Sequence, residues 1–135
     1  MLQVLQRYYG IENEDVWRLA TGLGAGLSRQ GQVCGALLGG AAACGLILGR
    51  QRQAGHEQRY DRRNDVYAKV QELSRRVGEQ FGTIQCGELT GCDFKTPAGQ
   101  QTYKEKGLLG GLCIPLVHFV VDTVPELCGP SGAKT

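Results

Sequence analysis

The six cysteines are the residues of this chain that could do the most distinctive chemistry: Cys34, Cys44, Cys86, Cys92, Cys113 and Cys128. None belongs to a Cys-x-x-Cys pair, and most lie at the edges of helix-like segments. A thiol at a helix start is favoured as its thiolate, which is both the nucleophile and the metal ligand. The placement therefore indicates redox chemistry or metal binding.

The composition indicates one globular domain, residues 1–135. The chain has 135 residues, of which 41% are hydrophobic and 21% charged, and a formal net charge of +2. A chain of this length is expected to bury about two thirds of its unfolded surface around a single core. The net charge is too small to indicate a nucleic-acid partner. Two histidines and no Gly-x-Ser-x-Gly motif also disfavour a hydrolase.

The N-terminal residues do not follow the order of a secretory signal, so we expect a cytoplasmic protein. Thiols stay reduced in that compartment. Redox cycling or metal binding is then a better explanation of six cysteines than a fixed disulfide framework.

Helical patterns dominate, and we expect an all-α bundle of about five helices around a Gly/Ala-rich central helix. Gly10 should end a first helix, and Asn13 should cap a second that stops near Gly22. The glycines of 22–26 indicate a structural turn, since no strand precedes them. The predicted elements are helices over 2–9, 13–22, 33–49, 56–81 and 115–127, a turn region over 84–93, a loop over 97–101 and a frayed tail over 129–135.

The segment between Arg29 and Arg50 carries no charge and has the length of a membrane span. Its glycines and glutamines weaken insertion, so we expect a buried central helix rather than a membrane helix. Gly35, Gly39 and Ala43 recur every four residues, and this nearly bare face should let another helix approach closely.

Two thiols are predicted at helix starts. Cys34 should lie in the first turn of the central helix, and Cys113 precedes Pro115, a residue tolerated at the first helical position. A helix terminus contributes about 0.3–1 kcal/mol, too little by itself to ionise an ordinary thiol at pH 7. A second influence is required, either Arg29 or a neighbouring cysteine.

Three parts of the chain carry a joint pattern of cysteines and glycines: residues 18–39 with the run Cys34-Gly-Ala-Leu-Leu-Gly39, the run Ile84-Gln-Cys86-Gly-Glu-Leu-Thr-Gly-Cys92-Asp93, and the later Cys113. Together they resemble the redox-active protein family named for its C_GCAxxG_C_C cysteine pattern. The resemblance covers nearly the whole chain. It implies that Cys34, Cys86 and Cys113 are shared thiols, with Cys92 a frequent companion. Similar members also carry a cysteine in an Asn-Cys-x-Gln-Ala-Val context, which would lie upstream of Met1. Cys44 and Cys128 fall outside the pattern and are expected to be buried or terminal residues.

Three interpretations follow. In the first, the protein is a thiol-dependent oxidoreductase with an unknown redox partner, in which Cys34 is the reactive thiolate and a disulfide forms with Cys86, Cys92 or Cys113. In the second, Cys34, Cys86, Cys92 and Cys113 bind a metal ion or an iron–sulfur cluster. In the third, the chain is a non-catalytic helical module, for example a homodimer joined through the Gly/Ala face. The first two require these thiols to gather in one place.

Overall fold

The computed structural model describes residues 1–130, and the predicted all-α class is confirmed. The elements are α1 (Leu2–Tyr9), α2 (Glu14–Ala20), the 3₁₀ turn η1 (Thr21–Leu23), α3 (Gly24–Leu27), α4 (Gly35–Leu48), α5 (His56–Phe81), α6 (Cys86–Thr90), α7 (Pro97–Glu105), the π-helical turn η2 (Leu109–Cys113) and α8 (Ile114–Cys128). Within the described residues, β pairing is limited to one isolated bridge between Val33 and Gln85.

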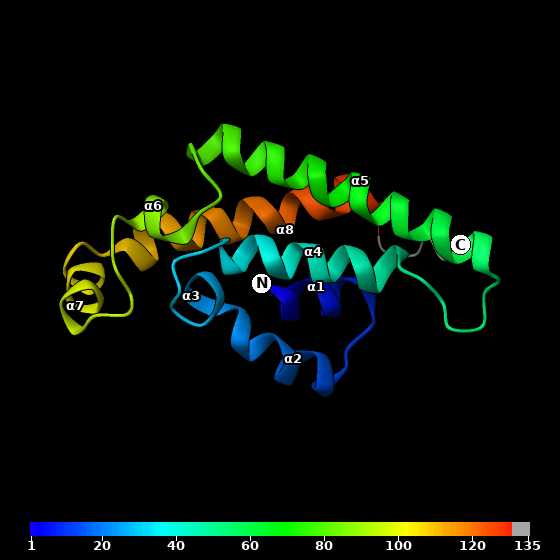
Figure 1. Cartoon of the computed structure of the whole chain (residues 1–135), viewed down its shortest axis with the longest axis horizontal. Helices are drawn as coiled ribbons and strands as arrows, with labels where there is room; N and C mark the ends of the chain where they lie inside the picture. The colour runs from blue at the N-terminus through cyan, green and yellow to red at the C-terminus, as the bar shows by residue number, and fades with distance from the viewer. Residues whose placement is uncertain (131–135) are drawn as a thin grey trace.

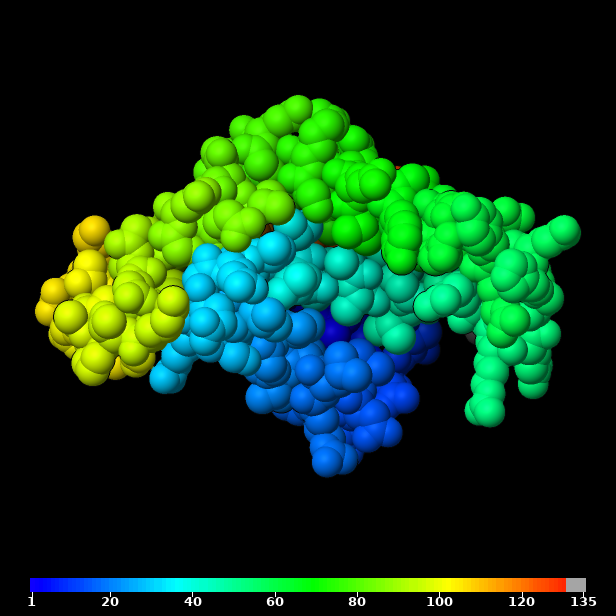
Figure 2. Space-filling model, viewed as in Figure 1, coloured from blue at the N-terminus to red at the C-terminus, as the bar shows by residue number. Residues whose placement is uncertain are grey.

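The central position of α4 is confirmed. It packs against α5, α8 and α1, and α5 and α8 also pack against each other (Figure 1). In the space-filling view α5 forms one side of the molecule and the N-terminal segment the opposite side, with α7 at one end (Figure 2). The predicted tail lies partly in 131–135, which are outside the described residues.

The first two helices begin and end where the sequence predicts. Gly10 follows α1 with φ 64°, a left-handed conformation that glycine adopts without strain. The Asn13 side chain accepts a hydrogen bond from the Asp15 amide at 2.8 Å, which satisfies an otherwise unpaired donor at the start of α2. After α2, the chain leads through η1 and α3 to the start of α4.

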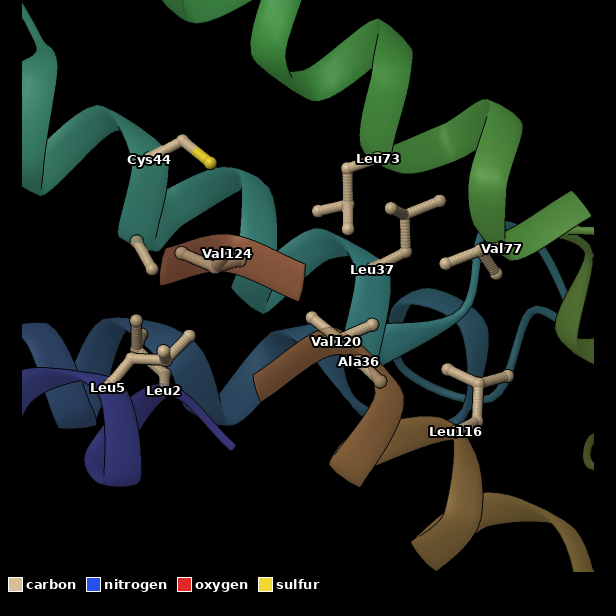
Figure 3. Packing of buried hydrophobic residues seen from close by; sticks show 11 residues of the cluster. Leu2, Leu5, Ala36, Leu37, Cys44, Leu73, Val77, Leu116, Val120 and Val124 are labelled. Carbon is tan, nitrogen blue, oxygen red and sulfur yellow. The ribbon is translucent and has the colours of Figure 1, made fainter. Parts of the chain in front are cut away.

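The main core lies where α4, α5 and α8 meet (Figure 3). Its buried side chains are Leu2, Leu5, Ala36, Leu37, Ala43, Cys44, Leu73, Val77, Leu116, Val120 and Val124. A Cβ at Gly40 would lie 2.7 Å from Val120 Cγ1 and 2.8 Å from Leu73 Cδ2. The absent side chain therefore permits the close approach of these helices, as the small residues of α4 predict.

The predicted loop over 97–101 was wrong, because these residues form the first part of α7. The Thr96 hydroxyl accepts a hydrogen bond from the Gly99 amide at 3.0 Å, and Pro97 occupies the start of the helix, where its missing N–H costs nothing. Threonine followed by proline is a helix start signal, and it was outweighed by the Pro/Gly content of the segment.

The predicted last helix is confirmed as α8, Ile114–Cys128, with Pro115 in its first turn, but a π-helical turn precedes it. The helical path begins at Leu109 and runs through η2 into α8, with the Ile114 amide bonded to the Leu109 carbonyl. Proline cannot donate the usual backbone hydrogen bond, and the wider turn accommodates that loss. Cys113 consequently lies inside a continuous helical segment, so the argument from a free helix start does not hold for this thiol.

Among the described residues, the segment Leu109–Cys128 is long and apolar enough to cross a membrane by length and composition alone. Of this apolar segment 22% is buried inside the protein, and Leu116, Val120 and Val124 are among the buried side chains. This helix, rather than 33–49, is the longer apolar one.

Candidate functional site: a cysteine-lined pocket

A pocket of about 350 Å³ lies where the start of α4, α6 and the η2–α8 junction meet. Cys34, Cys86 and Cys113 all line it, although they come from segments far apart in the sequence. The remaining lining is largely apolar and includes Ala36, Leu89, Phe94, Leu112, Leu116 and Val117. The structure therefore brings three of the four predicted site thiols to one cavity.

A short backbone pairing holds Cys34 beside Cys86. The bridge between Val33 and Gln85 precedes both cysteines by one residue. The Cys34 amide donates to the Ile84 carbonyl at 2.9 Å, and the Cys86 amide donates to the Gln32 carbonyl at 2.7 Å. Because backbone hydrogen bonds fix these two segments, each thiol starts a helix next to the other, Cys34 as the cap of α4 and Cys86 as the first residue of α6.

Glycines let these segments approach one another. A Cβ on Gly26, where φ is +64°, would lie 2.6 Å from Cys86 Cβ and 2.7 Å from the Gln32 backbone. A Cβ on Gly35 would lie 2.6 Å from the Leu23 carbonyl oxygen. The glycine-rich segment is thus the structural turn that the sequence predicts, and its function is to pack under the cysteine loops.

The Cys86 thiol is buried, with 7% of the residue exposed. Burial raises its pKa to about 11, and the neighbouring Cys34, Cys113 and Cys92 add to the effect because a second negative charge nearby is unfavourable. These interactions place Cys86 at the centre of the four thiols.

Cys113 is half-buried and interacts with a tyrosine that the sequence analysis did not select. The Tyr103 hydroxyl lies 3.3 Å from Cys113 Sγ and donates a hydrogen bond to it. Burial and this hydrogen bond raise the pKa of Tyr103 above its usual value of 10, so the phenol remains a donor at neutral pH. Tyr103 packs edge-on against Phe94 across 5.2 Å between ring centroids. Helix α7, whose first part (97–101) was predicted as a loop, brings this side chain to the site.

Cys92 lies behind the pocket rather than on its surface. It is 5% exposed, clusters with Cys86 and Phe94, and its thiol donates to the Thr90 carbonyl at 3.3 Å. Arg29, the other influence that the sequence suggested, is exposed and does not line the pocket. The neighbouring thiols do lie close to Cys86, but they raise its pKa rather than favour its thiolate.

In residues 1–130 no group of three or more histidine, cysteine, aspartate or glutamate side chains is arranged to hold a metal ion. Three of the thiols line the pocket and Cys92 lies behind it, and together they do not form a ready ligand set. The metal or iron–sulfur interpretation stays a prediction.

The sequence analysis also missed a contact between Cys44 and Cys128, whose sulfurs lie 3.3 Å apart. They are separated by 84 positions, and neither matches the family pattern. Only the packing of α4 against α8 could reveal the pair.

Comparisons with known proteins agree with the cysteine pattern. An "Uncharacterized protein" of Archaeoglobus fulgidus is 36% identical over 81 residues, which cover 57% of this chain and 52% of that protein. The chain thus spans about half the length of this curated relative. No solved structure matches. The family model described as "Putative redox-active protein (C_GCAxxG_C_C)" matches residues 1–127, and the chain belongs to that family.

Proposed function

We propose that this protein is a thiol–disulfide oxidoreductase whose reaction takes place in the cysteine-lined pocket. The observation that carries the proposal is that Cys34, Cys86 and Cys113 open into one largely apolar cavity. Thiol–disulfide exchange needs an accessible thiol and a second thiol close enough to resolve the mixed disulfide. Family membership supports redox activity in general, and the pocket supports this form of it.

Cys34 is the attacking thiol in this proposal. It is half-buried, lines the pocket and lies at the N-cap of α4, so its sulfur can be reached from the cavity. Its sulfur attacks one sulfur of a substrate disulfide, a Cys34 mixed disulfide forms, and the substrate S–S bond breaks. The first substrate thiolate leaves and takes up a proton.

Cys86 is the resolving thiol. Its raised pKa keeps it protonated and unreactive towards external disulfides, and the backbone bridge holds it next to Cys34. After losing its proton, its sulfur attacks Cys34 Sγ, forms the Cys34–Cys86 disulfide and releases the second substrate thiol. Two cysteine thiols are oxidised and one substrate disulfide is reduced to two thiols, so the step balances.

The apolar lining selects the substrate. A disulfide that carries an apolar or aromatic group next to its sulfurs would bury that group against Leu89, Phe94 and Val117. Exclusion of water from the same cavity would limit side reactions of the sulfur intermediates.

The test is the reaction of the reduced protein with an aromatic disulfide such as dithiobis(nitrobenzoate), followed by mass spectrometry. In C128S, where Cys128 cannot contribute, we expect the further substitution C34S to slow the fast phase at least tenfold, and C86S to accumulate the mixed disulfide on Cys34. C128S is the matched control, because Cys128 does not line the pocket. Its pocket reaction should match that of the parent protein.

Three results would contradict the proposal. Unchanged fast reaction in C34S/C128S would remove the assigned nucleophile. A stoichiometric metal in protein purified without chelator, lost in the same serine variants, would favour the metal interpretation. Thiols that all react only above pH 8 would favour the non-catalytic module.

A further inference from the structure

A second pair of thiols lies in direct contact away from the pocket. Cys44 Sγ on α4 and Cys128 Sγ at the end of α8 are 3.3 Å apart. Cys44 is fully buried in the main core, where Figure 3 shows it among the core side chains, and Cys128 is partly exposed. The contact thus joins a protected sulfur to one that an external molecule can reach.

This pair is separate from the pocket. Neither residue lines the cavity, and Cys44 lies ten positions after Cys34 along α4. At the rise of an α-helix, that separation is about 15 Å. The two pairs therefore cannot exchange sulfurs without a large rearrangement.

The surroundings shift the pKa values of the two thiols in opposite directions. A thiolate on Cys128 accepts the hydrogen bond of the Cys44 thiol, which lowers the pKa of Cys128 and raises that of the less solvated Cys44. Lys69 on α5 favours the charged form of either sulfur, and Asp65 opposes it at Cys128. Tyr9, whose hydroxyl donates to the Gly129 carbonyl at 2.6 Å, is the other titratable group beside the pair.

We propose that Cys44 and Cys128 form a second redox dithiol, which low-molecular-weight disulfides oxidise to an internal disulfide. The Cys128 thiolate attacks one sulfur of the small disulfide, whose S–S bond breaks and releases a thiol. Cys44 then gives up its proton and attacks Cys128 Sγ, releasing the second thiol. Two cysteine thiols become one disulfide as one small disulfide becomes two thiols.

The sulfurs need to approach by about 1.3 Å to reach the length of a disulfide bond. The new bond would join the end of α8 to the middle of α4 and close a long loop of the chain. Oxidation at this site would then stabilise the fold, and because a Cys34–Cys86 disulfide would also close a long loop, the Tm shift due to this pair is measured in C34S. The proposal does not depend on the function proposed for the pocket.

The experiment treats the reduced protein with oxidised glutathione, alkylates the remaining thiols and digests the product with chymotrypsin without reduction. Cleavage after Leu38 separates Cys44 from Cys34, and cleavage after Phe119 separates Cys128 from Cys113. We expect a linked pair of peptides that contains Cys44 and Cys128. Oxidation should also raise Tm by on the order of 10 °C.

Two variants sharpen the result. C34S should keep both the linked peptides and the Tm shift, even where it abolishes the pocket reaction, whereas C34S/C128S should lose both. Recovery of Cys44 and Cys128 only as alkylated or singly glutathionylated peptides would overturn the proposal. So would a Tm shift that persists in C34S/C128S.

Discussion

The pocket cysteines and the Cys44–Cys128 pair show two ways in which one fold brings distant thiols together. At the pocket, loops, helix ends and close glycine contacts position the sulfurs around a cavity. At the pair, two long helices of the main core place the sulfurs in direct contact. The pocket can therefore open locally, while the pair should separate only when the core itself opens.

The hydrophobic clusters support this distinction. Cys44 belongs to the main core, whereas Cys86 and Cys92 belong to a smaller cluster with Phe94, partly covered by Tyr103 and Leu108. Small satellite clusters bury less apolar area and open at lower free energy. The proposed resolving thiol Cys86 thus lies in the smaller cluster, Cys34 lies at the edge of the main core, and Cys44 is protected inside that core.

The largest expected effect comes from the core. Leu73 is fully buried between α4 and α8, so L73A should lower the free energy of unfolding by about 2–5 kcal/mol. Alkylation of Cys44 should accelerate with the fraction of opened molecules, about tenfold for each 1.4 kcal/mol of stability lost, as urea unfolding and timed iodoacetamide labelling would show. Y67A, at an exposed position of the same helix, is the control. Labelling of Cys44 unaffected by L73A would contradict its protection by the core.

A glycine substitution should affect the pocket instead. In G26A the new methyl group would meet the Cys86 side chain and the Gln32 backbone at a positive φ, and we expect a loss of about 1–3 kcal/mol. Displacement of Cys86 should slow formation of the pocket disulfide. G22A is the matched control, because its methyl group would meet only Ser28 Oγ at 3.7 Å. Equal effects of the two substitutions would mean that the close packing at Gly26 does not position Cys86.

Sequence reasoning predicted the elements whose signals are local and strong. The helix over 56–81 and the Asn13 cap depend on neighbouring residues, and both are confirmed. The last helix was predicted from Pro115, but the π turn before it was not, because the proline suggested that no helix continued upstream. Tyr103 was missed because nothing in its sequence neighbourhood indicated a contact with Cys113.

Which thiols meet depends on long-range packing. The family resemblance grouped Cys34, Cys86, Cys92 and Cys113, and three of them line one pocket. It gave no indication for Cys44 and Cys128, because nothing in their spacing shows that α4 and α8 bring them to 3.3 Å. Helix packing had to be known before that contact could be expected.

The pH dependence of the free energy of unfolding should report the burial of the Cys86 thiol. The pKa of Cys86 is about 11 in the folded chain against an ordinary 9, because burial disfavours its thiolate. The unfolded chain therefore ionises first. The stabilising contribution of this neutral thiol is complete below pH 9 and is lost as pH rises to about 11.

We accordingly expect the Tm of the parent protein to fall more steeply between pH 9 and 11 than that of C86A, with both kept reduced. Tyr9, whose pKa burial raises to about 12, should add a further loss above pH 10 that both proteins share. Parallel curves for the two proteins would show that the Cys86 thiol is not buried as a neutral group.

The smallest effect should come from the hydrogen bond between Tyr103 and Cys113. Y103F keeps the ring against Phe94 and removes only the hydroxyl donor, so stability should change little. A hydroxyl donor forms a stronger hydrogen bond to a charged sulfur than to a neutral one. Loss of the Tyr103 hydroxyl should therefore slow alkylation of Cys113 by about two- to fivefold at pH 7. The greater nucleophilicity of a less stabilised sulfur offsets part of this effect. Peptide-resolved iodoacetamide kinetics would measure this, with Cys128 as the internal reference. Slower labelling at both cysteines would indicate a general tightening of the fold, and only a change confined to Cys113 supports a direct contact.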